Sequence, residues 1–190
     1  YRHDLPTFLT IDFGYRMPAV LWFQTEVIND VEHIYIIDEI CHQRNIKTTD
    51  LIAMIKDRHY NLHQIFGDPA GNQVSALAGA SEWEIFYRHT GWRIFALRNK
   101  SSRSIASGIS HVRNFILSED GVRRLHIDTR CKGIIEDLEG YSYPEHKEFR
   151  DLKELPVKDG RFDHGCDALR YGIINKFPIK NYEIKLKGRV

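Results

Sequence analysis

Acidic residues stand at three places in this chain where their charge needs an explanation. Asp12 lies inside an apolar, β-rich segment, and Asp68 ends a second short apolar run. A third group opens the last helix-forming segment and consists of Asp163, His164 and Asp167. An ionised carboxylate inside a sheet costs several kcal/mol unless it is paired, hydrogen-bonded or bound to a metal. These residues are therefore the first candidates for chemistry.

Each acid also has a structural explanation of its own. Asp12 can cap the turn at Gly14, and Asp68 can open an Asp-Pro turn. Asp163 can serve as an N-cap, with Asp167 complementing the helix dipole. One metal site would explain all three groups, because strand ends and the first turn of a packed helix can meet at one point. Oxygen ligands there suit Mg²⁺ or Mn²⁺, and two such ions about 4 Å apart would activate water and stabilise the leaving oxygen of a phosphodiester.

The first sixty residues predict the elements that would carry the first acid. Residues 8–14, 18–23 and 33–40 are β-rich and separated by short breaks, which indicates an antiparallel meander. The apolar period then changes and predicts an amphipathic helix from 51 to about 60, with its N-cap in 48–50.

Beyond residue 60 the pattern alternates between strands and helices. Short strands are predicted at 64–68, 93–97 and 124–127. Helices are predicted at 74–88, 102–117, 130–138 and 163–176. In the second of these helices the expected apolar face consists of Ile105, Ile109, Val112 and Ile116. Pro and Gly without a clear period predict a loop or hairpin at 139–162.

This order of elements predicts an α/β fold with a mixed β-sheet, an antiparallel meander plus parallel strands, flanked by helices. Ribonuclease H-like nucleases and actin-like ATPases share the order, and the pattern alone does not separate them.

The composition excludes several classes of protein. The 190 residues (22.3 kDa) are 42% hydrophobic and 28% charged with a net charge of +1, which excludes a disordered tail, a coiled coil and a collagen-like repeat. No apolar stretch approaches the roughly 20 residues of a membrane span. The three cysteines form no CxxC pair, so no structural zinc site or disulfide scaffold is indicated. Without an initiator Met or signal peptide, residues 1–190 are expected to be a single domain of a longer protein.

Four motifs resemble the nuclease domain of bacteriophage terminase large subunits, the motors that package viral DNA and cut the concatemer. In chain order these motifs are 10–15 (TIDFGY), 36–39 (IIDE), 66–70 (FGDPA) and 163–171 (DHGCDALRY). The resemblance covers nearly the whole chain and implies a ribonuclease H-like fold and a metal-dependent endonuclease of double-stranded DNA. No Gly-x-x-x-x-Gly-Lys-Ser/Thr loop occurs, so the ATPase motor would lie outside these residues.

The resemblance also implies roles for residues of this chain. Asp12, Asp68 and Asp163 match the catalytic acids, and two divalent ions, Mg²⁺ or Mn²⁺, would be held by Asp12, Asp68, Asp163 and His164. Glu39 and Asp167 are possible outer-shell residues, and Asp167 could also be a ligand. Asp38 is expected at an exposed strand end. Arg170 and Tyr171 are expected to pack and to hydrogen-bond their helix.

Basic residues become candidates for contacts with DNA phosphates once a nuclease is considered. Between residues 97 and 132 the chain has eight Lys or Arg against three acids. The expected DNA-binding residues are Arg98, Lys100, Arg103, Arg113 and, in or beside the 139–162 hairpin, Lys153, Lys158 and Arg161. The implied partners are double-stranded DNA, the terminase ATPase domain, the small terminase subunit and the portal, with no membrane, in the host cytoplasm.

Three alternatives stay open from the sequence. A junction resolvase or transposase could have the same fold and would be separated by dimerisation and binding to branched DNA. An actin-like nucleotide-binding domain fits the Ile11-Asp12-Phe13-Gly14 segment in part but lacks the second glycine and the hydroxyl residue of such loops. A nuclease fold reduced to a binding module would show no stabilisation by Mg²⁺ or Mn²⁺.

Overall fold

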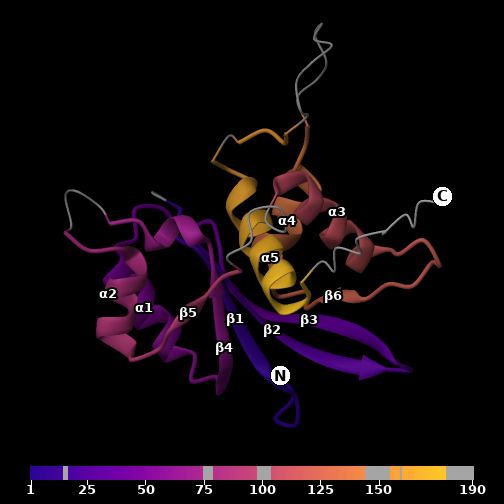
Figure 1. Ribbon diagram of the computed structural model, residues 1–190, viewed down its shortest axis with the longest axis horizontal. Coiled ribbons are helices and arrows are strands. Elements are labelled where there is room, and N and C mark those ends of the chain that lie inside the picture. Colours follow the sequence, from indigo (N-terminus) through magenta and orange to yellow (C-terminus); the bar gives the residue numbers. More distant parts are fainter. Residues whose placement is uncertain (15–16, 75–78, 98–103, 144–154, 159, 179–190) are drawn as a thin grey trace, which may run out of the picture.

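A six-stranded mixed sheet forms the centre of the chain, in a computed structural model that describes residues 1–14, 17–74, 79–97, 104–143, 155–158 and 160–178 (Figure 1). The strand order is β5-β4-β1-β2-β3-β6. The strands are β1 (Thr7–Asp12), β2 (Ala19–Ile28), β3 (Val31–Ile40), β4 (Leu62–Gly67), β5 (Ile94–Phe95) and β6 (Leu125–Ile127).

The first three strands form the predicted antiparallel meander. Asn29 and Asp30 join β2 to β3 with positive φ angles of 50° and 62°. Asn and Asp tolerate this left-handed backbone, which the tight turns of two-residue hairpins require. Strands β4, β5 and β6 then add in parallel at the two sides of the meander, so the predicted mixed sheet is confirmed.

Helices cover both faces of the sheet (Figure 1). On one face lie α1 (Thr48–Asp57) and α2 (Glu82–Thr90), which pack against a core that includes Leu9 and Ile11 of β1. On the other face lie α3 (Ile105–Ile116), α4 (Lys132–Gly140) and α5 (Asp163–Lys176), with a core that includes Phe8. A short 3₁₀ helix, η1 (Pro69–Asn72), follows β4.

The alternation of side chains along β1 decides where the first acid points. Successive side chains of a strand face opposite sides of the sheet. Leu9 and Ile11 belong to the core under α1 and α2, whereas Phe8 belongs to the core under α5. Thr10 and Asp12 contact residues of α5 and therefore share the side of Phe8. The sheet thus directs Asp12 to the helix that carries the other predicted site residues.

Two expectations about where helices begin are wrong. The N-cap of α1 is Lys47, without a side-chain cap, because the Thr48 hydroxyl donates a hydrogen bond to Glu82 of α2 instead. The helix predicted at 74–88 begins at Glu82 and not at residue 74, because Ser81 caps its first turn.

The inner face of α3 also differs from the prediction by one position. Ile116 is 41% exposed, and Phe115 is buried in its place. The last turn of α3 therefore packs through Phe115, which belongs to the core shared with α5. Residues 139 and 140 belong to α4, so the predicted loop begins only at Tyr141. In the described part of the chain, every helix is too short or too polar to cross a membrane.

Candidate active site

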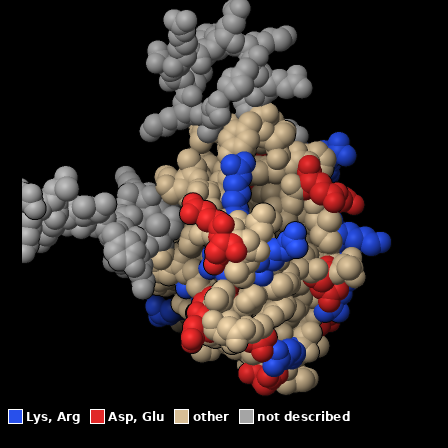
Figure 2. Space-filling model, turned by 90° about the vertical axis from the view of Figure 1, so that its right-hand side faces the viewer, with Lys and Arg blue, Asp and Glu red and all other residues tan. Residues whose placement is uncertain are grey.

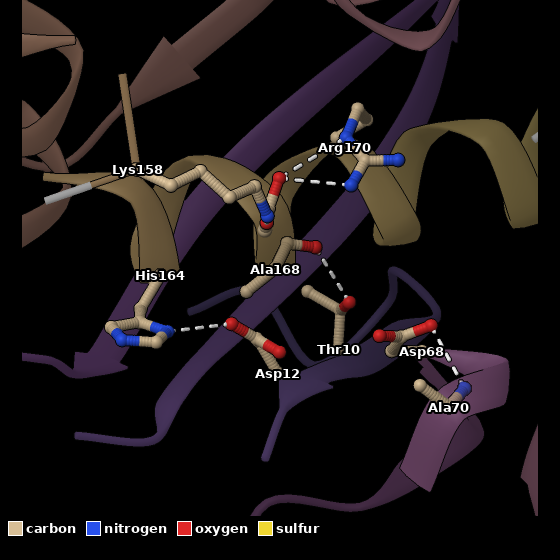
Figure 3. A network of polar contacts seen from close by, with 9 residues as sticks. Thr10, Asp12, Asp68, Ala70, Lys158, His164, Ala168 and Arg170 are labelled. Atoms are coloured by element: carbon tan, nitrogen blue, oxygen red, sulfur yellow. Dashed lines mark hydrogen bonds and ion pairs between the residues drawn. The ribbon is translucent and has the colours of Figure 1, made fainter. Parts of the chain in front are cut away.

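Asp12 and His164 form the centre of the candidate site. Asp12 is the last residue of β1 and is 9% exposed, and His164 is the second residue of α5. The Nδ1 atom of His164 lies 2.9 Å from Oδ2 of Asp12, as Figure 3 shows. This contact joins residues that are 152 positions apart in the chain.

The charges around Asp12 change the pKa values of both groups. Burial raises the pKa of Asp12 and the hydrogen bond with His164 opposes that rise, while the negative charges of Asp167 and Asp68 add to it. The bond to Asp12 raises the pKa of His164 despite partial burial. Among the described residues, several negative charges therefore surround Asp12, and the His164 imidazole is hydrogen-bonded to it. A bound cation would stabilise these charges.

Gly14 and Thr10 determine how α5 lies against β1. A Cβ atom on Gly14 would lie 2.3 Å from the His164 ring, so a side chain at this position would displace the imidazole. The Thr10 hydroxyl donates a 2.7 Å hydrogen bond to the backbone oxygen of Ala168 (Figure 3). Thr10 thereby links α5 to β1 two positions before Asp12, on the same face of the strand.

Asp68 follows β4, which runs parallel to β1. Its Oδ1 accepts a 3.0 Å hydrogen bond from the N–H of Ala70, so Asp68 is the N-cap of η1. The structural explanation for this residue is thus confirmed for one of its oxygens. Because Asp68 also acts electrostatically on Asp12, the turn does not remove it from the site. Figure 3 shows Asp12, Thr10 and Asp68 along the strands beneath α5.

The two acids of α5 have different surroundings although both are buried. Asp167 is paired with Lys158, at 2.7 Å, and with Arg170, at 2.8 Å. Asp163 has an Oδ1 atom that is buried without a hydrogen-bond partner among the described residues. Asp163 opens the helix as its first residue and not as its N-cap, which is Phe162. Arg170 hydrogen-bonds within its own helix, as predicted.

The donor chemistry of this site fits a hard divalent cation. It offers the carboxylates of Asp12 and Asp68 at neighbouring strand ends, the partnerless Asp163 oxygen and the imidazole of His164. Among the described residues, however, no three His, Cys, Asp or Glu side chains lie close enough together to hold an ion as they stand. A shared ion would therefore require these side chains to turn toward one another.

The chain is similar to phage terminases in sequence and in fold. The terminase large subunit of Escherichia phage T5 is 30% identical over 173 residues, which is 88% of this chain and 34% of that protein. The P22 large terminase nuclease domain superposes with a TM-score of 0.66 at 20% identity, covering 93% of this chain and 84% of that one. The large terminase nuclease domain from bacteriophage SPP1, with bound Mn, gives 0.60 at 19% identity, covering 90% and 86%.

This chain is a relative of the phage terminase large subunits and has the fold of their nuclease domain. The ribonuclease H-like fold class predicted from the sequence is confirmed. No family model matches the chain. The chain spans about a third of the length of the T5 relative.

Two acids at the end of β3 have roles within this terminase-type fold that the sequence did not reveal. Glu39 accepts hydrogen bonds of 2.7 and 2.8 Å from the N–H groups of Gly133 and Ile134, at the first turn of α4. Asp38 accepts hydrogen bonds from Arg58, at 3.1 Å, and from Tyr60, at 3.2 Å. The expectation of an exposed end at Asp38 is therefore wrong.

Part of the predicted DNA-binding set can be placed on this fold. Arg98, Lys100, Arg103 and Lys153 lie outside the described residues. The Arg113 guanidinium lies 5.6 Å from the ring of Tyr143, Arg161 lies over the ring of Phe162, and Lys158 is paired with Asp167. Figure 2 shows basic and acidic side chains interspersed on one face of the molecule, with no continuous basic area among its described residues.

The two described arms of the predicted hairpin approach each other. The N–H of Val157 donates a 2.9 Å hydrogen bond to the backbone oxygen of Ser142. Residues 144–154, which would form the rest of the hairpin, lie outside the described part. Because Lys158 follows Val157 and contacts Asp167, this arm lies beside the first turns of α5.

Sequence reasoning missed five residues around the site: Thr10, Gly14, His42, Asp137 and Gly165. Thr10 carried a signal, because it lies two positions before Asp12 and so on the same face of a strand. Gly165 stands within the 163–171 motif, but nothing local shows what approaches it. His42 and Asp137 lie 95 positions apart and meet only in the folded chain.

Proposed function

We propose that this chain is a metal-dependent endonuclease that cuts double-stranded DNA during phage DNA packaging, by two-metal-ion hydrolysis of a phosphodiester. The observation that carries the proposal is the buried Asp12 carboxylate in a terminase nuclease fold. Asp12 lies within hydrogen-bond distance of His164, and the negative charges of Asp167 and Asp68 act on it. Bound Mn in the similar SPP1 domain supports a divalent ion.

The proposed metal ligands come from two strand ends and from helix α5. Asp12 and Asp68, at the ends of adjacent parallel strands, would hold the ions, with Asp163 and His164 as ligands from α5. The field of Asp167 at Asp12 supports Asp167 as a further acid near the ions, although Lys158 and Arg170 already neutralise it. When bound, Mg²⁺ or Mn²⁺ would lower the pKa of a water molecule and stabilise the leaving oxygen.

His164 would orient Asp12 rather than act only as a ligand. Its Nδ1 is already within hydrogen-bond distance of Asp12, and the bond raises the pKa of the imidazole. A carboxylate fixed by one neighbour presents its other oxygen in a defined direction. Gly14 leaves the space that this orientation requires.

The packaging context is also part of the proposal. The T5 relative is a terminase large subunit of which this chain matches about a third, so a terminase ATPase domain, a small terminase subunit and a portal would be partners of the whole protein. The host cytoplasm would be the place of action. Lys158 and Arg161, with the predicted basic residues outside the described part, would contact DNA phosphates.

Conversion of supercoiled plasmid to nicked and linear forms tests the proposal. We expect cleavage with Mg²⁺ or Mn²⁺, none with EDTA, and none with Asp12→Ala, which should remain folded by circular dichroism. Asp50→Asn, which changes an exposed acid in the first turn of α1, serves as the matched control and should cleave like the wild type.

Each alternative predicts a different result. Full activity of Asp12→Ala would contradict the assignment of the site. Preference for branched over linear DNA would point to a resolvase. A folded protein that neither cuts DNA nor gains thermal stability from Mg²⁺ or Mn²⁺ would be a binding module.

A further inference from the structure

Asp137 is a buried acid that the proposed reaction does not use. It lies on α4 and is 0% exposed. Its Oδ1 is 2.6 Å from Nε2 of His42, and its Oδ2 accepts a 3.0 Å hydrogen bond from the backbone N–H of Gly165. One carboxylate therefore joins three segments: the residues after β3, helix α4 and the first turn of α5.

Burying a carboxylate at this position costs free energy. Burial raises the pKa of Asp137, and the hydrogen bond with His42 acts in the opposite direction. Packing alone would be served at lower cost by an apolar side chain of similar size. The polar contacts of Asp137 therefore have to account for its presence.

The contact with α5 is a helix cap supplied from another element. The first N–H groups of a helix have no partner within it. Phe162, the N-cap residue of α5, has an apolar side chain that cannot accept a hydrogen bond, and Asp137 accepts from the N–H of Gly165 instead. A Cβ atom on Gly165 would lie 2.1 Å from Oδ2 of Asp137, so the carboxylate occupies the space that any other residue would fill.

The same arrangement occurs one helix earlier. Cys131, the N-cap residue of α4, makes no side-chain cap, and Glu39 from β3 accepts the hydrogen bonds of that first turn. A Cβ atom on Gly133 would lie 2.6 Å from Cβ of Cys41 and 3.1 Å from Oε1 of Glu39. Two carboxylates thus position two successive helices. Glu39 of β3 holds the first turn of α4, and Asp137 of α4 holds the first turn of α5.

We propose that Asp137, held by His42, is a positioning residue for the candidate nuclease site, because it fixes the turn of α5 that presents His164 to Asp12. His164 immediately precedes Gly165, so a shift of the Gly165 amide moves the imidazole. The role in cleavage rests on the proposed function, whereas the placement of α5 rests on the contacts alone.

Two substitutions of similar volume separate the hydrogen bonds from the packing. Asp137→Asn keeps an oxygen for the Gly165 N–H and a polar group for His42, whereas Asp137→Leu keeps neither. Ser104→Ala is the matched control, because it removes the cap of α3, where the Ser104 hydroxyl accepts from the N–H of Ser107. All three variants and the wild type are compared at equal folded fraction, determined by thermal unfolding.

Amide hydrogen exchange reads the placement of α5 without any need for activity. We expect the Gly165 amide to exchange faster in Asp137→Leu than in the wild type and to regain protection in Asp137→Asn. Ser104→Ala should leave it unchanged. Unchanged protection of Gly165 in folded Asp137→Leu would overturn the proposal.

Plasmid cleavage at increasing Mn²⁺ concentration reads the consequence for the site. Loss of an orienting outer contact typically costs about 10- to 100-fold in activity or metal affinity. We therefore expect Asp137→Leu to need about tenfold more Mn²⁺ for half-maximal cleavage, with Asp137→Asn close to the wild type. The positioning role would be overturned if Asp137→Leu lost no more cleavage activity than Ser104→Ala and kept the Mn²⁺ midpoint of the wild type.

The proposal also stays testable if Asp137→Leu does not fold or if the wild type does not cleave DNA. If Asp137→Leu does not fold, His42→Asn takes its place, because Asn tolerates the positive φ of 59° at this position but is too short to replace the Nε2 contact with Asp137. An unchanged Gly165 exchange rate and Mn²⁺ midpoint in this variant would overturn the proposal. If the wild type does not cleave DNA, the proposed function fails, and Gly165 exchange alone decides whether Asp137 places α5.

Discussion

Helices α2 and α3 begin differently from helices α4 and α5. Ser81 and Ser104 cap α2 and α3 from the adjacent position in the chain, with hydrogen bonds of 3.1 and 3.2 Å. Carboxylates from other elements cap α4 and α5, and at α5 Gly165 leaves the space that the carboxylate occupies.

The two kinds of cap constrain a helix to different degrees. A local serine determines where a helix starts, but it moves with the helix and does not fix its place on the sheet. A carboxylate from another element determines both the start and the place. The helix that needs a fixed place is α5, because it carries His164, which contacts Asp12 of β1.

The largest effect is expected from Gly165→Ala. The added methyl group would collide with Oδ2 of Asp137, and we expect a loss of about 3 kcal/mol in the free energy of unfolding, measured with urea. In an Asp137→Ala background the obstacle is absent, so the same change should cost about 1 kcal/mol or less. Equal costs in the two backgrounds would show that the carboxylate is not what Gly165 accommodates.

A smaller effect is expected from Glu39→Ala. Two N–H groups of α4 would lose their partner, and we expect a loss of about 2 kcal/mol in the free energy of unfolding. Ser104→Ala, which removes a local cap that is exposed to water, should cost about 1 kcal/mol. The comparison between the two kinds of cap would break if the serine change cost as much as the glutamate change.

The smallest effect is a dependence on pH that only a carboxylate cap can show. Burial raises the pKa of Asp137 above its ordinary 3.8, so the folded state keeps this proton to a higher pH than the unfolded state does. The contribution of Asp137 to stability should therefore be largest at low pH and decrease as the pH rises from 3.8 through the folded pKa.

Urea unfolding at a series of pH values measures this dependence. The stability of the wild type relative to Asp137→Asn should increase as the pH falls from neutral toward 4. The difference between the wild type and Ser104→Ala should stay constant, because a hydroxyl does not titrate there. A relative stability that rises with pH would mean that His42 outweighs burial at Asp137.

The fold was largely predictable from local patterns. The antiparallel meander of the first three strands and the final helix starting at Asp163 depend on neighbouring residues, and the structure confirms them. The predictions failed where a residue contacts another element. Thr48 of α1 donates a hydrogen bond to Glu82 of α2, and Asp38 of β3 forms an ion pair with Arg58.

The site was predictable only in its residue types. Asp12, Asp68, Asp163 and His164 stand out because polar groups at the ends of apolar segments are unusual. Their catalytic roles stay predictions, and the structure brings only Asp12 and His164 into direct contact among them.

The order of strands and helices and the likeness to terminase nuclease domains follow from the sequence alone. Only the tertiary structure decided which groups satisfy the buried acids: His164 at Asp12, Lys158 at Asp167, and His42 with the Gly165 amide at Asp137. The physical reason is that strand and helix periods follow from neighbouring residues. The partners of a buried charge are chosen by packing, which joins residues far apart in the chain and leaves no period to read.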